Sequence, residues 1–291
     1  MRVLFFGYSQ AGHRAVQVLE ERGDDVAAVV THRDDPHENR WYKTPAEAAH
    51  RAGFPVVYSD DLSKDEIAAL AERAAPDLVL SVFYRDLLPD RVLRAARRAA
   101  LNLHPSFLPR YRGRAPLNWV LVHGESETGV TLHHMVARAD AGDIVAQRRI
   151  PIAPRETALS LYYKIEEAGT ALLRETLPLV AQGTAPRIPQ DITQGNYVGR
   201  RRPEDGRIDW SWPARRVDCL VRAVAPPWPG AFVEVDGQKV GIHAGEPGEP
   251  ASAPAGTVRV TDGKLSVACA DRWFRVDEGD GLERLRAKAS S

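Results

Sequence analysis

Asn102 and His104 are the residues of this sequence that point most directly to chemistry. They alternate in a short apolar run, Leu101-Asn102-Leu103-His104, which stops at Pro105 because proline cannot donate to a sheet. Alternate side chains of a strand lie on one face, so we expect the amide and the imidazole to leave the strand end together. An imidazole with an ordinary pKa of about 6.5 can move protons at neutral pH, and an amide N–H can stabilise a developing oxyanion.

A lone Asn or His at a strand end is more often a turn former or a surface residue than a catalyst. A second segment, Thr128 to Gln147, strengthens the chemical interpretation because it predicts a strand, a polar turn and another strand. The turn carries Asp140, with Gly142 just beyond it. Asn, His and Asp at the ends of strands in one sheet can converge, and a carboxylate beside an imidazole stabilises the imidazolium.

Other polar residues of this segment have a structural interpretation. Asp143 is predicted to be a turn or strand-start residue rather than a second acid. His133 and His134 are neighbours on a strand, so one should face inward and one outward, and neither has partners at metal-ligand spacing. No metal site is expected.

The loop after His104 is stiff and basic. It carries Pro105, Pro109 and Pro116 with Gly113, and among them lie the three arginines Arg110, Arg112 and Arg114. Polar groups at a strand's carboxyl end beside such a loop are typical of a ligand site in an open α/β sheet.

The first two thirds of the chain alternate strand and helix patterns. The apolar runs Val3–Phe6, Val26–Thr31, Pro55–Tyr58, Asp77–Phe83 and Leu101–Leu103 predict strands, and Ala11–Arg22, Pro45–Ala52, Lys64–Ala74, Pro116–Val122 and Glu156–Gln182 predict helices. Right-handed crossovers make such strands parallel. The sequence therefore predicts a Rossmann-like, doubly wound and mostly parallel sheet.

The first strand-to-helix turn contains Gly7 and Gly12 but lacks the three-glycine dinucleotide pattern and the Lys-Ser/Thr of a phosphate-binding loop. A tight turn is the favoured interpretation, and an NAD-dependent oxidoreductase is disfavoured. A helix N-terminus can still bind a substrate phosphate, so Tyr8 and Gln10 are candidate substrate-binding residues. The charged loop 32–44 is either a substrate flap or a solvated connection.

Composition shifts to Pro, Gly, Gln and Arg between residues 183 and 203, which predicts a linker. We expect a catalytic domain over 1–188, a linker over 189–203 and a C-terminal subdomain over 204–291. The last part contains short strand-like runs at Ala231–Val235, Val240–His243, Thr257–Val260 and Leu265–Cys269, a spacing that suits a small barrel.

Composition places the 291-residue chain among ordinary globular proteins, with 27% charged and 44% hydrophobic residues. Lys plus Arg equal Asp plus Glu at 39 each, so the balance calls for neither nucleic acid nor an anionic membrane. Two cysteines make no disulfide framework, and neither a signal peptide nor an apolar run of membrane-spanning length is evident. A cytoplasmic protein is expected.

Several motifs together resemble the folate-dependent formyltransferases. They are Asn102-Leu103-His104, the loop from Arg110 to Trp119, the segment Thr128–Gln147, the loop Phe83–Leu88, and the stretches Gly199–Trp210 and Val221–Phe232. The chain is most similar to the domain that formylates UDP-4-amino-4-deoxy-L-arabinose and to sugar N-formyltransferases, and more distantly similar to methionyl-tRNA formyltransferase. The likeness is specific in the middle and loose over the last sixty or so residues.

The resemblance implies a transferase that moves a formyl group from 10-formyltetrahydrofolate to an amine. It implies catalytic roles for Asn102, His104 and Asp140, an OB-like C-terminal barrel and a homodimer, without a metal. The formyl donor would lie along two main-chain segments with one arginine nearby: Asp86, Leu87 and Leu88; Val136, Ala137, Arg138, Ala139 and Asp140; and Arg114. As side chains, Leu87 and Leu88 are expected to pack in the core.

The resemblance also favours a nucleotide-linked amino sugar as acceptor, because the loop around Arg114 is like that of the aminoarabinose enzymes. Arg200 and Arg201 could bind a diphosphate, with Asn196 or Tyr197 near a base, or could be solvated surface. Residues 204–291 carry 12 Lys plus Arg and 14 Asp plus Glu, whereas a tRNA platform should be basic. Methionyl-tRNA formyltransferase and a non-catalytic nucleotide-binding protein remain the alternatives.

Overall fold

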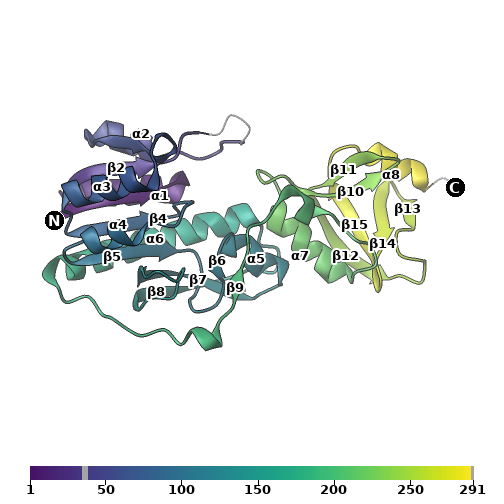
Figure 1. Ribbon diagram of the computed structural model, residues 1–291. Coiled ribbons are helices and arrows are strands. Elements are labelled where there is room, and N and C mark those ends of the chain that lie inside the picture. The colour runs from purple at the N-terminus through teal and green to yellow at the C-terminus, as the bar shows by residue number, and fades with distance from the viewer. Residues whose placement is uncertain (35–38, 290–291) are drawn as a thin grey trace. The chain divides into compact units, whose positions relative to one another are not determined.

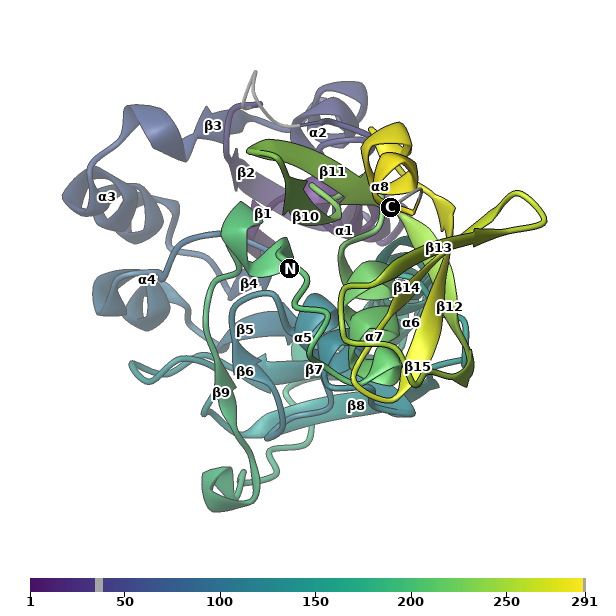
Figure 2. The same cartoon turned by 90° about the vertical axis from the view of Figure 1, so that its right-hand side faces the viewer.

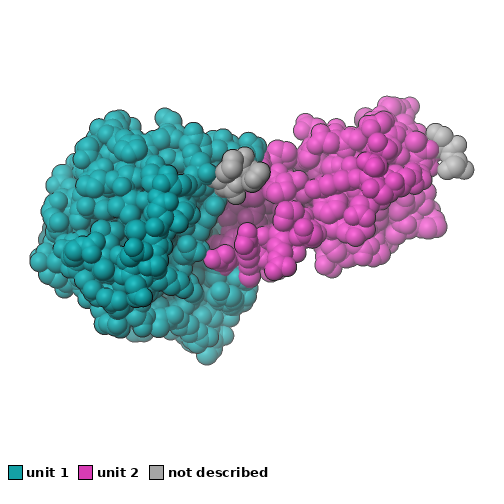
Figure 3. Space-filling model, turned by 45° about the horizontal axis from the view of Figure 1, so that its top comes forward, with its two compact units in different colours: residues 1–113, 128–151, 163–198 teal, residues 114–127, 152–162, 199–291 magenta. Residues whose placement is uncertain are grey.

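The computed structural model describes residues 1–34 and 39–289, so part of the predicted flap 32–44 lies outside the described residues. The chain forms two compact units that are each discontinuous in sequence (Figure 3). The first unit consists of Met1–Gly113, Thr128–Pro151 and Tyr163–Val198, and the second of Arg114–Glu127, Ile152–Tyr162 and Gly199–Ser291. The predicted boundaries at 188 and 204 stay a prediction.

The first unit is built on a seven-stranded sheet with the order β3-β2-β1-β4-β5-β7-β8 (Figure 1). Strands β1 to β5 are parallel where they pair, and β7 runs antiparallel to β5. This mostly parallel, doubly wound sheet confirms the predicted fold class. The strands are β1 (Arg2–Gly7), β2 (Asp25–Thr31), β3 (Val56–Tyr58), β4 (Leu78–Val82), β5 (Ala99–His104), β7 (Glu127–His134) and β8 (Ile144–Pro151).

Helices pack on the sheet of this unit. The helices α3 (Lys64–Ala74) and α4 (Asp90–Ala95) bury Ile67 and Val92 against Leu4 and Phe6 of β1. In α6 (Ala158–Gln182), Gly169 comes so close to Leu103 that an added Cβ would lie 2.9 Å from that side chain. The remaining helices are α1 (Ser9–Glu21) and α2 (Pro45–Ala52), which pack on each other.

Local sequence explains where these helices begin. Ser63 caps α3 by accepting from the Glu66 N–H, and the Glu66 carboxylate accepts from the Ser63 N–H, which is a capping box. Thr44 caps α2 by accepting from the Glu47 N–H, with Pro45 at the first helical position, and Gly53 ends the helix at a φ of 73°.

One row of side chains crosses four strands of the sheet. Phe6 is in register with Ser81, Ser81 with Asn102, and Asn102 with His133. Residues directly opposite each other on neighbouring strands share a face, so this row changes from apolar at β1 to polar at β5 and β7. The polar half of the row lies where the sequence predicted chemistry.

The second unit combines helices α5 (Pro116–Val122), α7 (Ala214–Val224) and α8 (Leu282–Lys288) with antiparallel strands (Figure 2). A two-stranded sheet pairs β10 (Ala231–Val235) with β11 (Gln238–Ile242). A four-stranded sheet has the order β12-β15-β14-β13, and its members are β12 (Ala244–Pro250), β13 (Val258–Thr261), β14 (Lys264–Ala268) and β15 (Arg272–Glu278). Whether these strands close as an OB-like barrel stays a prediction.

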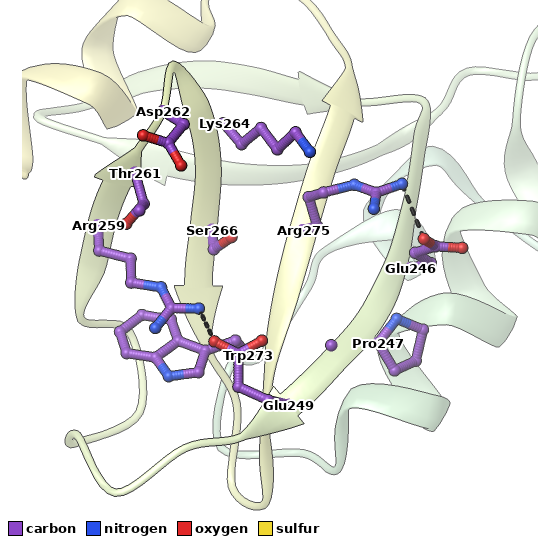
Figure 4. A pocket seen from close by; sticks show the side chains of 11 residues that line it. Glu246, Pro247, Glu249, Arg259, Thr261, Asp262, Lys264, Ser266, Trp273 and Arg275 are labelled. Atoms are coloured by element: carbon purple, nitrogen blue, oxygen red, sulfur yellow. Dashed lines mark hydrogen bonds and ion pairs between the residues drawn. The ribbon is translucent and has the colours of Figure 1, made fainter.

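One face of the four-stranded sheet holds a polar pocket of about 250 Å³ (Figure 4). Its charged side chains come in equal numbers of both signs, and they bond across strands: Arg259 to Glu249, and Arg275 to Glu246 at 2.8 Å. Arg259 also lies 3.9 Å from the centre of the Trp273 ring. This face therefore carries no surplus of positive charge.

No helix in the described ranges 1–34 and 39–289 is both long enough and apolar enough to cross a membrane.

Candidate active site

The three predicted catalytic residues converge on one carboxylate oxygen. Asp140 Oδ1 lies 3.4 Å from Asn102 Nδ2 and 3.5 Å from His104 Nδ1. Asn102 and His104 come from alternate positions of β5, as predicted, whereas Asp140 comes from the connection between β7 and β8. Because β7 is antiparallel to β5, its end lies beside the start of β5, and the connection places Asp140 over the face of β5.

Asp140 is held as an anion. Burial alone would raise its pKa, but His104, His133 and the Gly113 N–H together hold the pKa of Asp140 well below its usual range. The Gly113 N–H donates to Asp140 Oδ2 at 2.8 Å. The carboxylate therefore stays ionised at neutral pH.

His104 is buried, and the atoms around it determine the tautomer of its neutral ring. Its Nε2 lies 2.9 Å from the carbonyl oxygen of Tyr111. Since a carbonyl can only accept, Nε2 carries a hydrogen, and Nδ1 of the neutral ring is free to take a proton. Burial lowers the pKa of His104 below its usual value, although Asp140 and the Tyr111 carbonyl oppose this effect. The ring is therefore a neutral base at pH 7.

The loop beside the site is held by short strand pairing. β6 (Arg112–Gly113) pairs with β9 (Tyr197–Val198) from the predicted linker. Asn196 Oδ1 accepts from the Tyr111 N–H at 2.6 Å, so its side chain binds main chain here. Tyr111 and Asp140 have positive φ values of 57° and 51°, which are unfavourable for a tyrosine in particular. Two residues of the site therefore have an unfavourable backbone conformation.

His133 is a member of the site that the sequence did not reveal. Its Nε2 lies 3.2 Å from Asn102 Nδ2 and 3.5 Å from Asp140 Oδ1, and its side chain is buried. His134 is half-buried, as expected for alternate residues of a strand. The signal that could have found His133 is its register opposite Asn102, which requires knowing that β5 pairs with β7.

The two segments predicted to hold the formyl donor expose apolar side chains. Leu87 is 71% exposed and Val136 is 43% exposed. The expectation that Leu87 packs in the core is wrong, because it follows β4 in an open loop beyond the sheet. Leu88 does pack against the core, as predicted. The remaining residues of the two segments are exposed or half-buried: Asp86, Ala137, Arg138, Ala139 and Asp140.

The other candidate binding residues are distributed over both units. Tyr8 follows β1, where its hydroxyl accepts from the Tyr42 hydroxyl at 2.8 Å, and Gln10 Oε1 accepts from the Lys43 N–H at 2.9 Å. Arg114 is the exposed first residue of the second unit. Arg200 is exposed, and Arg201 is half-buried over the Trp119 ring at 4.8 Å. Roles for these side chains stay predictions.

Asp143 is confirmed as a strand-start residue. It immediately precedes β8, its main-chain oxygen accepts from the His134 N–H at 2.8 Å, and its carboxylate pairs with Arg187 at 2.7 Å. Among the residues that the structure describes, no group of three or more His, Cys, Asp or Glu side chains could hold a metal ion.

Gly113→Ala should damage both the site and its support. Gly113 has a φ of 101°, and an added Cβ would lie 2.2 Å from the Val198 oxygen, so the β6–β9 pair must shift. The shift would move the N–H that Asp140 accepts. We expect a Tm lower by several degrees, as for a loss of about 1–3 kcal/mol, together with reduced turnover. Gly199→Ala is the control, because nothing lies within 4 Å of its added Cβ; equal Tm values would contradict the prediction.

Comparison with known families agrees with this geometry. A model described as formyl transferase matches residues 1–177, and a model described as formyl transferase, C-terminal domain, matches residues 201–289. The chain belongs to the formyl transferase family. This confirms the predicted family and, at the level of that family, the prediction of a formyltransferase.

Solved structures share the fold. HypX from Aquifex aeolicus in complex with tetrahydrofolic acid is 23% identical with a TM-score of 0.64, over 96% of this chain and 44% of HypX. The chain thus spans less than half of HypX. An N-formyltransferase from Helicobacter canadensis, in complex with folinic acid and dTDP-3-aminofucose, is 16% identical with a TM-score of 0.74, over 95% of this chain and 98% of that chain. A 4-N formyltransferase from Francisella tularensis is 18% identical with a TM-score of 0.66, over 84% and 96%.

Proposed function

We propose that this protein transfers a formyl group from 10-formyltetrahydrofolate to the amine of a nucleotide-linked amino sugar. The observation that carries the proposal is that Asn102 Nδ2 and His104 Nδ1 both lie within 3.5 Å of Asp140 Oδ1, in a chain of the formyl transferase family. An imidazole base, an amide donor and an ionised carboxylate are groups suited to formyl transfer to an amine.

His104 would take the proton from the attacking amine at Nδ1. The neutral ring has its hydrogen on Nε2, where it donates to the Tyr111 oxygen, so Nδ1 has the free lone pair. The protonated Nδ1 would lie 3.5 Å from Asp140 Oδ1, and the negative charge of that carboxylate stabilises the imidazolium. The same imidazolium can return the proton to the folate nitrogen that leaves, which restores the base.

Asn102 would donate from Nδ2 to the oxygen that becomes negative when the amine attacks the formyl carbon. Removing one donor of this kind costs roughly 3–4 kcal/mol in other enzymes. Asp140 then has two tasks, to stabilise the His104 imidazolium and to keep the Asn102 amide in place.

The folate is the formyl donor in this proposal, and it supplies an activated one-carbon group. Leu87 and Val136 present apolar surface in the two segments expected to hold it, and the main-chain groups of Leu87 and Val136 bond to no other described residue. Free N–H and C=O groups suit the alternating donors and acceptors of a pterin edge. Chains of similar fold bind folinic acid and tetrahydrofolic acid.

The nucleotide would bind through its phosphates to the second unit. A pocket of about 110 Å³ there is lined by Arg201, Arg202 and Trp228, and no carboxylate is among its lining residues. The Arg201 guanidinium donates to the Asp205 main-chain oxygen at 2.9 Å. Burial lowers the pKa of Arg201, yet an arginine stays charged at neutral pH. Such a pocket favours a diphosphate.

Replacing Arg202 by alanine should raise KM for the nucleotide sugar about tenfold, because one charge-assisted hydrogen bond to phosphate is lost, and should leave kcat nearly unchanged. Arg216→Ala is the control, since Arg216 is another arginine of the second unit but is not among the residues that line this pocket. An unchanged KM for the nucleotide sugar in the Arg202 variant would contradict the proposed diphosphate site.

UDP-4-amino-4-deoxy-L-arabinose, or a related UDP- or dTDP-amino sugar, is the acceptor we favour, as the loop around Arg114 resembles that of the aminoarabinose enzymes. Methionyl-tRNA is the second candidate. It is disfavoured by the acidic balance of residues 204–291 and by the paired charges on the four-stranded sheet. A cytoplasmic location and a homodimer stay predictions.

The decisive experiment offers the purified protein 10-formyltetrahydrofolate with UDP-aminoarabinose, several dTDP-amino sugars and charged initiator tRNA, and detects formylated product by mass. We expect product with one or more nucleotide sugars and none with tRNA. Formylation of tRNA alone would overturn the acceptor. Folate binding without transfer to any amine would favour a non-catalytic binding protein.

A further inference from the structure

The amide nitrogen of Asn102 lies between two atoms that can both accept hydrogen bonds. Asp140 Oδ1 is 3.4 Å away and His133 Nε2 is 3.2 Å away. Since Asp140 is an anion, the Asn102 atom that faces it must be the donor, Nδ2. The second hydrogen of the same nitrogen is available for His133.

The neighbours of His133 define which of its nitrogens carries hydrogen. Its Nδ1 lies 2.9 Å from the main-chain oxygen of His134, which can only accept, so Nδ1 carries a hydrogen. Its Nε2 faces the Asn102 donor and therefore accepts. These two contacts are both satisfied when His133 is neutral with its hydrogen on Nδ1. The same Nε2 also lies 3.5 Å from Asp140 Oδ1, so a hydrogen on Nε2 would donate to that carboxylate instead, and the position of the ring hydrogen distinguishes the two arrangements.

We propose that His133 is a positioning residue of this active site: its Nε2 binds one hydrogen of the Asn102 amide and thereby aims the other at the reacting oxygen. The proposal rests on the proposed function. An Asn side chain has two orientations of nearly the same shape that exchange its oxygen and nitrogen, and its hydrogen-bond partners determine which one is favourable. Asp140 and His133 both require Nδ2 at this position, so His133 keeps the amide in this orientation even when the bond to Asp140 is given up to the formyl oxygen.

The two hydrogen bonds of the Asn102 side-chain amide then have different roles. The His133 bond is fixed by a buried ring whose other nitrogen is anchored to main chain. The bond to Asp140, at 3.4 Å, is long for an N–H donor to a carboxylate and can yield to a stronger acceptor. A developing oxyanion is such an acceptor, so Asn102 can exchange partners without turning its amide.

The first test is spectroscopic and does not depend on activity. Long-range proton–nitrogen NMR spectra of protein labelled with ¹⁵N-histidine distinguish the two neutral ring forms and the charged form. At pH 7 we expect His133 to be neutral with hydrogen on Nδ1 and His104 to be neutral with hydrogen on Nε2, each assigned by loss of its signals in a single variant. A charged His133, or one with its hydrogen on Nε2, would overturn the proposal.

The second test is kinetic and uses His133→Leu, His133→Gln and the control His134→Gln. Leucine removes the acceptor, whereas the glutamine side-chain oxygen can replace it. We expect kcat of the leucine variant to fall roughly 10- to 100-fold, with KM for the formyl donor within twofold of the wild type. This loss is smaller than the loss expected when the hydrogen-bond donor Asn102 is itself removed. The glutamine variant should regain most of kcat.

His134→Gln is a matched control because His134 is adjacent to His133 and is half-buried on the other face of β7. It should turn over like the wild type. Equal losses in both His133 variants, with Tm values unchanged, would contradict positioning through an acceptor. If the wild type transfers formyl to no amine, the proposed function fails, while the NMR result still decides the state of His133.

Discussion

Replacing His104 by alanine should reduce kcat roughly 10²- to 10⁴-fold, the range typical of a lost general base. His104 Nδ1 is the atom that would take the amine proton. Another imidazole nitrogen, His133 Nε2, lies equally close to Asp140 Oδ1, but it is engaged with Asn102. Folate binding, measured by calorimetry with folinic acid, should persist. Near-normal turnover by the alanine variant would contradict the proposed role of His104 as general base.

His104→Gln separates chemistry from packing in this prediction. Alanine leaves the buried Tyr111 oxygen without its donor, which destabilises the fold by about 1–3 kcal/mol. A glutamine amide can still donate to that oxygen but cannot take a proton at neutral pH. We therefore expect equal loss of kcat in both variants and a higher Tm for glutamine.

The pH dependence of the wild type follows from the same residue. Burial lowers the pKa of His104 below its usual value of 6.5, so the neutral base is fully present at pH 7. The rate constant kcat/KM should be level through neutral pH and fall only on the acid side of 6.5. An acid limb centred above pH 7 would contradict a neutral His104.

Asp140→Asn should reduce kcat by roughly 10³-fold, because it removes the charge that stabilises the His104 imidazolium while keeping the shape of the side chain. Asp143→Asn is the matched control, since Asp143 lies in the same connection but pairs with Arg187. Measured kcat should be near the wild-type value in the control. Similar kcat in both variants would show that Asp140 has no catalytic part.

Stability gives Asp140 a second, independent measurement. The pKa of Asp140 is held below its usual 3.8 in the folded chain, so its ionised form stabilises the fold above that pH. This contribution is lost as pH falls from 3.8 toward the lowered value. The Tm difference between wild type and Asp140→Asn should therefore be full at pH 6 and shrink below pH 4.

Apolar runs and their spacing were sufficient to predict most of the first unit. The strands at the centre of its sheet are buried on both faces, so they read as continuous apolar runs, and Ser63 and Gly53 mark helix ends by local bonding. In the second unit, α7 was missed, and so was β12, which contains Gly245, Pro247 and Gly248. The residues of β12 pair with β15, and a pairing between distant segments cannot be predicted from local propensity.

The sequence by itself determined that Asn102 and His104 share one face of a strand, because side chains alternate along any strand. It also supplied Asp140 in a turn and the family to which the chain belongs. Only the tertiary structure decided that β7 pairs antiparallel with β5, which places His133 opposite Asn102 and lets the β7–β8 connection place Asp140 over both. Strand pairing joins residues distant in the chain, so the geometry of this site exists only once the sheet has formed.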